Sequence, residues 1–167
     1  SRADIASAPV DKKSRLYESV FKELRFKPQE AIKLLKQEGW YDINRDGILE
    51  KNKRPFRFVL YYAKGLLPDE DVARIIKLAW LRIGIDVSIQ PLDKRDLTKL
   101  IKNRQYDAIL LDQYFGENFT YFEDIFSISG ANNYMNYTNK TVNYFFQIAK
   151  KQIRKQKNNC FVVLSIV

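Results

Sequence analysis

The sequence predicts an α/β domain, and two observations carry that prediction. Over residues 56–111, short apolar runs typical of strands alternate with amphipathic helices in the order strand, helix, strand, helix, strand. Two strands joined by a helix of about a dozen residues pair in parallel through a right-handed crossover. We therefore expect a mostly parallel sheet flanked by helices.

An amphipathic helix is expected before this unit, from Pro28 to Gly39. Pro28 suits the first helical turn, and Gly39 suits the position just after a helix end. Between them, Ala31, Leu34 and Leu35 share one face. The spacing predicts a helix that packs this face against the domain.

The strands and helices of the main unit follow in order. Aromatic and β-branched residues at 56–62 predict the first strand, and period-two alternation at 85–90 predicts the second. Between them, a helix ending at Gly84 is predicted by apolar residues at helical spacing: Val72, Ile75, Ile76, Ala79, Trp80 and Ile83. A basic helix spans Lys94–Arg104, with Leu97, Leu100 and Ile101 directed inward. Its basic side chains are expected to face outward: Lys94, Arg95, Lys99, Lys102 and Arg104. The apolar run 106–111 predicts a third strand that is covered on both faces.

The strand order decides where a ligand is expected. If the first strand is central and the order is 2-1-3, the topology reverses between strands 56–62 and 107–111. Ligands of such sheets lie outside the carboxyl ends of the strands at that point. We therefore expect ligand contacts from Tyr62, Ala63 and Lys64 at the end of the first strand, and from Asp112 to Glu117 after the end of the neighbouring strand.

The remaining segments divide the chain into three parts: an irregular lead-in at 1–27, a lobe at 28–157 and an apolar tail at 158–167. The lead-in is expected to pack its apolar residues onto the lobe: Leu16, Tyr17, Val20, Phe21 and Leu24. Residues 113–122 are aromatic and polar without periodicity, which is typical of either a recognition loop or packing under a loop. A last helix, capped by Asn139, directs five apolar residues inward: Val142, Phe145, Phe146, Ala149 and Ile153. The tail is expected to be one apolar strand.

Composition excludes several kinds of chemistry. The chain has 167 residues, no histidine and one cysteine, Cys160, so neither a Ser-His-Asp nor a Cys-His site can form. The net charge of +9 is spread along the sequence and is compatible with solubility, nucleic acid or an anionic surface. No stretch has the roughly 18–20 apolar residues that span a bilayer. The N-terminal residues do not resemble a signal peptide, so we expect any targeting segment to lie outside this chain.

The turn that follows the first helix begins like a calcium-binding EF-hand loop. Asp42, Asn44 and Asp46 occupy the first, third and fifth positions, and Gly47 occupies the sixth. The twelfth position, where an EF-hand has a bidentate glutamate, is Lys53. We therefore interpret the segment as an Asx-rich turn, with Asp42, Asn44 and Asp46 as its weak candidate calcium ligands and no metal or cofactor predicted.

Several segments, in this order, resemble the C-terminal lobe of family 5 extracellular solute-binding proteins of ABC importers. The segments Ala31–Trp40 and Asp42–Glu50 are similar to the family patterns A-x-x-L-L-x-x-x-G-W and D-x-[DN]-x-D-G-I-x-E. Leu81–Val87 resembles a helix-to-strand junction, and Tyr106–Ala108 resembles the [FY]-D-A strand start. Asn132–Asn139 resembles the N-N-[YF]-x-x-Y-[ST]-N segment. The resemblance implies a single lobe of the periplasmic-binding-protein type.

The resemblance also implies a function without catalysis, in which a peptide or small solute binds between two lobes. The implied ligand-binding residues are Tyr62, Asp112, Gln113, Tyr114 and Glu117, with Asp112 or Glu117 as the carboxylate that meets the amino end of a peptide. Asp112-Gln113 replaces the Gly-Trp common in peptide binders. The implied partner is an ABC permease, and the implied location is periplasmic or extracytoplasmic at the membrane.

The family's first lobe has no counterpart here, so we interpret the chain as a fragment or a degenerate copy. One lobe supplies only half of the ligand contacts, which predicts weak or undetectable affinity for this chain alone. Calorimetry with a peptide library tests this expectation, and micromolar binding would contradict it. An exposed cleft face would also allow two copies to associate as a dimer.

Two other classes of function remain alternatives. The basic helix Lys94–Arg104 beside tyrosines suits single-stranded nucleic acid or an anionic surface, and binding that falls steeply with salt would favour that reading. We expect no nucleic acid as a partner, because a basic surface more often serves only to keep a protein soluble. The carboxylates Glu117, Glu123 and Asp124 suit acid–base catalysis, but their spacing does not mark a paired site.

Overall fold

The computed structural model describes residues 13, 17, 25–65, 67–112 and 119–163. The chain divides into two compact units, one formed by Glu23–Gln113 and the other by Ser1–Lys22 with Tyr114–Val167. The two units are considered separately below. The predicted packing of the lead-in falls on residues 16–24, which lie outside the described residues apart from the half-buried Tyr17.

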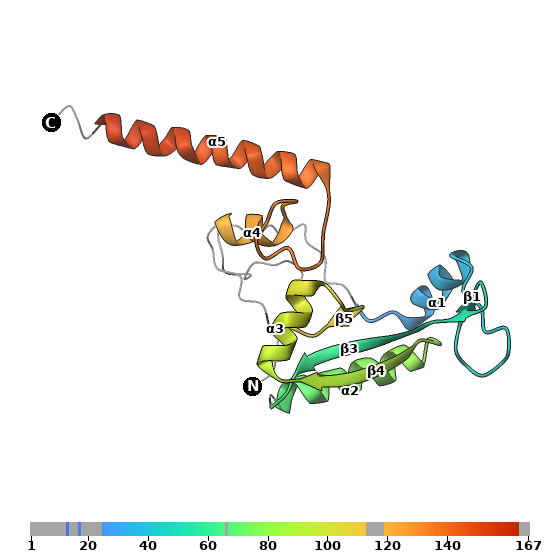
Figure 1. Cartoon of the computed structure of the whole chain (residues 1–167). Helices are drawn as coiled ribbons and strands as arrows, with labels where there is room; N and C mark the ends of the chain where they lie inside the picture. Colours follow the sequence, from blue (N-terminus) through green and yellow to red (C-terminus); the bar gives the residue numbers. More distant parts are fainter. Residues whose placement is uncertain (1–12, 14–16, 18–24, 66, 113–118, 164–167) are drawn as a thin grey trace. The chain divides into compact units, whose positions relative to one another are not determined.

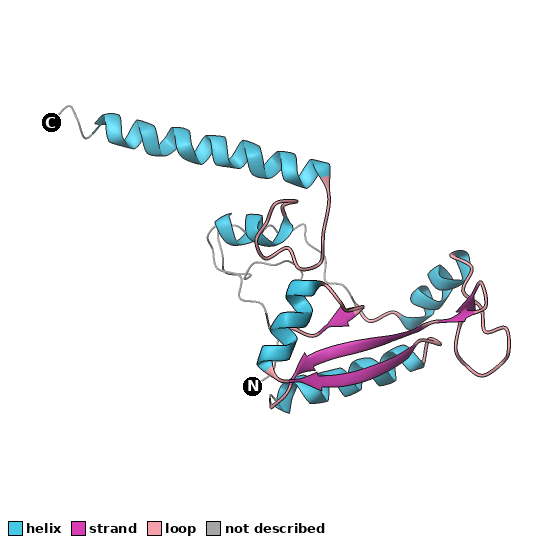
Figure 2. Ribbon diagram, viewed as in Figure 1, coloured by secondary structure: helices cyan, strands magenta, loops and turns pink. Residues whose placement is uncertain are grey.

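The first unit is built on a parallel three-stranded sheet in the order β4-β3-β5 (Figure 2). The strands are β3 (Arg57–Ala63), β4 (Asp86–Leu92) and β5 (Ala108–Ile109). All seven residues of β3 pair with β4, but only Leu60 and Tyr61 pair with β5. The first strand of the sheet is therefore central, which is the order on which the expected switch point depends. The third strand has only two residues and is much shorter than its apolar run predicts. Both residues are half-buried, so the strand is also less buried than predicted.

Helices cover both faces of this sheet. Helix α2 (Leu67–Leu81) lies along one face, and α3 (Lys94–Asn103) lies on the other (Figure 1). In α3 only Leu97 is fully buried, and the basic side chains predicted to face outward at Lys94, Arg95, Lys99 and Lys102 are exposed. Helix α1 (Pro28–Gln37) begins at the predicted proline and is followed by Gly39 at a positive φ of 85°. The predicted helices thus form where the sequence places them.

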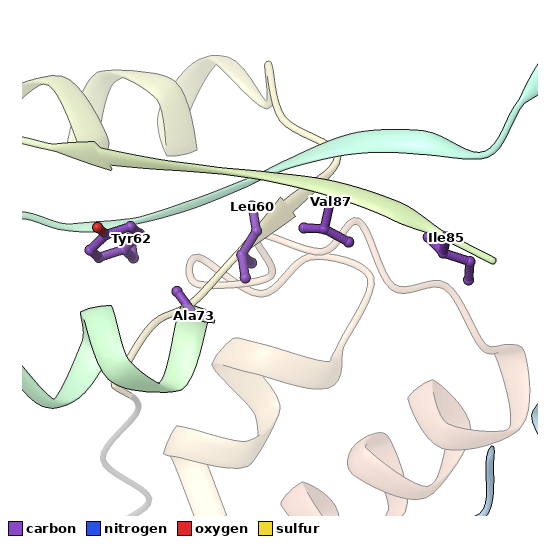
Figure 3. Close-up of a cluster of buried hydrophobic side chains, with 5 residues drawn as sticks. All are labelled: Leu60, Tyr62, Ala73, Ile85 and Val87. Carbon is purple, nitrogen blue, oxygen red and sulfur yellow. The ribbon is translucent and has the colours of Figure 1, made fainter. Parts of the chain in front are cut away.

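The core of this unit lies between α2 and the sheet (Figure 3). Its buried members alternate along the strands, as Leu60 and Tyr62 do on β3, and they pack with Ala73 of α2. Ile85 and Val87 extend the same layer. Because alternate residues of a strand face the same side, the period of two in the sequence becomes one continuous apolar surface.

The two tryptophans extend this core through ring contacts with β3 and the residue before it. Trp40 stacks on Phe56 with 4.3 Å between ring centroids, and Trp80 meets Phe58 edge to face at 5.0 Å. Aromatic pairs of this geometry add to the stability gained by burial. The rings therefore hold the ends of α1 and α2 to the sheet.

A small joint connects the loop after α1 to the amino end of the sheet. Strands β1 (Glu50–Lys51) and β2 (Arg54–Pro55) form an antiparallel pair. The Leu49 N–H donates to the Gly84 carbonyl at 2.8 Å, and the Asp86 N–H donates to the Phe56 carbonyl at 3.0 Å. These bonds fix the loop beside the first residues of β3 and β4.

The second unit contains α4 (Phe119–Phe126) and the long helix α5 (Lys140–Val163). Asn139 caps α5 as predicted, because its Oδ1 accepts hydrogen bonds from the N–H groups of Thr141 and Val142. The segment between the helices is held by Asn133, which is only 3% exposed. Its side chain donates to the Ser127 and Tyr137 carbonyls and accepts from the Tyr137 N–H.

The structure corrects three predictions about apolar residues. The tail was expected to be a strand, but residues 158–163 continue helix α5. Phe145 and Ile153 were expected to face inward, yet they are 62% and 38% exposed. Leu34 of α1 is also exposed, whereas Leu35 packs against the core. Within the part of the chain that the structure describes, no helix combines the length and apolar character needed to cross a membrane.

Candidate functional site

The carboxyl ends of β3 and β5 form the predicted switch point. The pairing of these strands stops at Tyr61 and Ile109, followed by one more bond in which the Leu110 N–H donates to the Tyr61 carbonyl at 2.8 Å. On the other side, the Lys64 N–H donates to the Leu92 carbonyl at 2.9 Å. Since successive residues of a strand bond to opposite neighbours, the N–H and carbonyl of Ala63 face the β5 side. Among the described residues, no backbone hydrogen bond reaches Ala63 from that side.

Two acidic side chains interact electrostatically beside this end of the sheet. Asp112 follows β5, and Asp69 lies in the first turn of α2. Burial raises the pKa of the Asp69 carboxyl above its ordinary value, and the negative charge of Asp112 raises that pKa further. Neither carboxylate forms an ion pair with a lysine or arginine that the structure describes. The site therefore carries two like charges that a cationic group would stabilise.

Replacing Asp112 by asparagine tests whether the two carboxylates share a field. We expect Asp112→Asn to lower the pKa of Asp69 towards its ordinary value while leaving it raised, because burial is the larger cause. The ionisation of Asp69 opposes folding, since its pKa is higher in the folded chain than in the unfolded chain. This penalty is present above the raised pKa and is lost as the pH falls through it, so the variant gains less stability on acidification.

The measurement is the pH dependence of the Asp69 side-chain carbon chemical shift in the parent chain and in Asp112→Asn. Glu38→Gln provides the matched control, because it removes one exposed carboxylate at the end of α1. An Asp69 titration that is the same in all three chains would show that Asp112 exerts no field on it.

The predicted ligand-binding residues are placed as follows. Asp112 is exposed at the end of the third strand, as expected. Tyr62 is only 5% exposed, and its ring lies in the core against α2 (Figure 3). Gln113, Tyr114 and Glu117 lie outside the described residues. Asp69 was missed, because in the sequence it reads as an ordinary acidic residue of a first helical turn.

Of the three acidic residues considered for catalysis, Glu123 and Asp124 make contacts within the second unit, Glu123 through its carboxylate and Asp124 through its backbone. Glu123 of α4 forms an ion pair with Lys150 of α5, and its backbone carbonyl accepts from Ser127. The backbone carbonyl of Asp124 accepts a hydrogen bond from Asn132. Glu117 lies outside the described residues. The contacts of Glu123 and Asp124 thus account for both residues as parts of the second unit's packing.

The Asp42–Asp46 turn forms a compact hydrogen-bonded loop. The Gly47 N–H donates to an Asp42 carboxylate oxygen at 3.1 Å, and the Asp46 N–H donates to Asn44 Oδ1 at 2.9 Å. The carboxylates of Asp42 and Asp46 approach that of Glu50, a residue that was not among the predicted ligands. Glu50 is the ninth residue of the turn when Asp42 is the first. The EF-hand pattern places its glutamate at the twelfth position, so it did not predict Glu50 as a ligand.

Comparison with known proteins gives a consistent family. The sequence profile of the bacterial extracellular solute-binding proteins, family 5 (middle region), matches residues 2–133. The oligopeptide-binding protein AppA of Bacillus subtilis (strain 168) is 27% identical over 136 residues, which are 77% of this chain and 24% of that protein. The chain thus spans about a quarter of that relative's length.

Solved structures show the same fold. The structure of AppA from Bacillus subtilis in complex with a nonapeptide matches with a TM-score of 0.77 and 26% identity, over 93% of this chain and 33% of that chain. The ABC transporter substrate-binding protein CtaP of Listeria monocytogenes matches with a TM-score of 0.71 and 19% identity, over 87% of this chain and 28% of that chain. The architecture described above is therefore that of periplasmic-binding-protein-like structures.

Proposed function

Because the chain belongs to the bacterial extracellular solute-binding proteins of family 5, we propose that it contributes one wall of a cleft that binds a peptide for an ABC importer. The family consists of proteins that bind solutes. AppA, which is similar to this chain, is an oligopeptide-binding protein, and its structure was determined in complex with a nonapeptide. The proposal for this chain rests on the carboxyl ends of β3 and β5.

The observation that carries the proposal is the acidic pair Asp69 and Asp112 at the switch point. A peptide with a free amino terminus brings one positive charge, and a carboxylate that accepts its N–H groups forms a charge-assisted hydrogen bond. Burial is the larger cause of the raised pKa of Asp69, and the charge of the bound amino group would offset the smaller part that comes from repulsion by Asp112. We propose Asp112 as the carboxylate that contacts the amino group, with Asp69 supporting it.

The backbone beside this pair suits an extended peptide. The N–H and carbonyl of Ala63 face the side where pairing with β5 has ended. A peptide in extended conformation could add its main chain to such an edge, which gives affinity without reading the peptide's sequence. The buried ring of Tyr62 would then serve as part of the wall's support, while Gln113, Tyr114 and Glu117 remain proposed ligand contacts beyond Asp112.

The family also directs the proposed location and partner. Its members are extracellular, so we propose an extracytoplasmic site of action, at the membrane beside an ABC permease. The chain spans 33% of the AppA structure, and the second wall of the cleft would come from a part corresponding to the rest of that structure. Binding to this chain alone should then be weaker than about 0.1 mM in dissociation constant.

Saturation-transfer NMR on the peptide tests the proposal, because it detects weak binding. A nonapeptide with a free amino terminus should receive saturation most strongly at its first residues, and its N-acetylated form should bind at least about fivefold more weakly. Asp112→Asn should remove this difference, whereas Glu38→Gln should keep it. Equal binding of the two peptides by the parent chain would contradict the assignment of the acidic pair to the amino terminus.

A further inference from the structure

A buried carboxylate with one unpartnered oxygen lies at the end of the loop between α1 and β1. Glu50 is 7% exposed, and its Oε2 accepts a hydrogen bond from the Ile43 N–H at 2.8 Å. Its Oε1 is buried and has no hydrogen-bond partner. A buried charged oxygen without a partner is costly, because it has lost water without replacement. A cationic group bound beside Oε1 of Glu50 would therefore offset the cost of burying this oxygen.

The surrounding carboxylates indicate what that group is. One carboxylate oxygen from each of Asp42, Asp46 and Glu50 lies within 4.8 Å of the other two. We propose that these three carboxylates bind one calcium ion. Calcium accepts oxygen ligands at about 2.3–2.6 Å, so two of its ligands can be up to about 5 Å apart. Calcium accepts about six to eight oxygen ligands in flexible geometry, whereas magnesium demands a near-ideal octahedron and usually keeps several waters, so a set of three protein carboxylates favours calcium.

In the part of the chain that the structure describes, no protein cation pairs with this cluster. Among the lysines and arginines in the described ranges, none forms an ion pair with Asp42, Asp46 or Glu50. The neighbouring Lys51 is directed elsewhere, with its Nζ 6.0 Å from the centre of the Trp40 ring. Three carboxylates held together without a counter-ion repel one another, and a divalent cation removes that repulsion.

The loop holds its ligands in place before the ion arrives. Asn44 positions Asp46 by donating to its Oδ2 at 3.1 Å and by accepting from its N–H at 2.9 Å. Glu50 is fixed by the backbone of Tyr41, whose carbonyl accepts from the Glu50 N–H at 2.7 Å. Gly47 allows the sharp turn between them with a φ of 88°. The site is therefore largely formed in the folded chain.

The structure also explains why Lys53 at the twelfth position does not exclude calcium. The loop does not continue into a helix as an EF-hand does, because the chain enters β1 at Glu50. Lys53 lies in the turn between β1 and β2, with a φ of 61°. The carboxylate that an EF-hand takes from its twelfth residue comes here from the ninth, Glu50.

This site is separate from the proposed peptide site. The loop adjoins the amino ends of β3 and β4, since the Phe56 N–H donates to the Leu49 carbonyl at 2.7 Å. The acidic pair Asp69 and Asp112 lies at the carboxyl end, about 20 Å along the seven residues of β3. The calcium ion would stabilise the joint between α1 and the sheet, whether or not a peptide binds.

Thermal unfolding of the chain, followed by circular dichroism, tests the proposal with calcium chloride, magnesium chloride or EDTA. At a calcium concentration about 100-fold above the dissociation constant, the midpoint should rise by about 5–10 °C, and magnesium should raise it less. Terbium should bind the same loop and emit when the adjacent Trp40 and Tyr41 are excited. A midpoint unchanged by calcium, together with no terbium emission, would overturn the proposal.

Two variants separate calcium binding from a purely structural role of Glu50. Glu50→Gln and the exposed Asp46→Asn should each weaken calcium binding at least about tenfold, while Glu38→Gln should bind as the parent does. In EDTA, Glu50→Gln should melt at or above the parent, because it removes an unpartnered buried charge. In calcium it should melt below the parent. A calcium shift that survives in both variants would overturn the assignment.

Discussion

Replacing Leu60 by alanine is expected to lower the free energy of unfolding of the first unit by about 2–5 kcal/mol. Leu60 is 5% exposed at the centre of β3, where it packs with Tyr62 and Ala73 in the core between the sheet and α2. The truncation removes apolar contacts and leaves a cavity that the rigid strand pairing does not let the neighbours fill. This change should cause one of the two largest losses of stability.

Urea unfolding followed by tryptophan fluorescence measures this loss. Both tryptophans of the chain, Trp40 and Trp80, lie in the first unit, so their emission reports on that unit alone. The matched control is Leu34→Ala on α1, because Leu34 is 61% exposed and the same atoms are removed. Equal shifts of the two urea midpoints would show that Leu60 is not in a packed core.

Replacing Gly84 by alanine is expected to be similarly damaging, with a loss of about 2–4 kcal/mol. Gly84 has a φ of 82°, which an L-residue adopts only with strain. Its added Cβ would also lie 2.7 Å from Leu49 Cγ, and Leu49 is only 8% exposed. Because the Leu49 N–H bonds to the Gly84 carbonyl, the clash cannot be relieved without disturbing the joint at the amino end of the sheet.

Gly65→Ala separates the two causes of this loss. Gly65 has a similar φ of 91°, but a Cβ there would meet no atom within 4 Å. Its replacement should therefore cost only the backbone strain, about 1 kcal/mol, in the same urea assay. If Gly84→Ala and Gly65→Ala lower the midpoint equally, the close packing of Leu49 on Gly84 contributes nothing.

Much of the first unit could be predicted because its signals are local. The alternation at 85–90, the proline at the start of α1 and the glycines after α1 and α2 each fix one backbone feature. The short helical crossovers then predict parallel strands, and the order 2-1-3 is one of the arrangements that they allow. These features need no knowledge of distant contacts, and the structure confirms them.

Burial was predicted less well, because periodicity does not say which side of a helix has a partner. On α2, apolar residues occur on more than one side, and the fully buried one is the small Ala73, while Ile75 is 65% exposed. The same reason accounts for Phe145 on α5. The tail 158–167 was expected to be a strand because it is apolar, yet its residues 158–163 continue the helix that begins at Lys140.

The candidate sites were also predicted only in part, because their local features are visible in the sequence and their long-range contacts are not. The switch point followed from topology, and Asp112 was expected there, but Asp69 approaches it only through the fold. Likewise, Asp42 and Asp46 are visible as a turn, whereas the unpartnered oxygen of Glu50 depends on burial against the joint. Contacts between residues far apart in sequence cannot be obtained from spacing alone.

The central claim, that a peptide binds at the carboxyl ends of β3 and β5, is tested most directly by an assigned amide NMR titration. A nonapeptide with a free amino terminus is added to the isotope-labelled chain up to millimolar concentration. The account predicts saturable shifts concentrated at Ala63, Lys64, Asp69 and Asp112, with little change in the Asp42–Glu50 loop. Shifts confined to other parts of the chain, or none that saturate with a common dissociation constant, would contradict it.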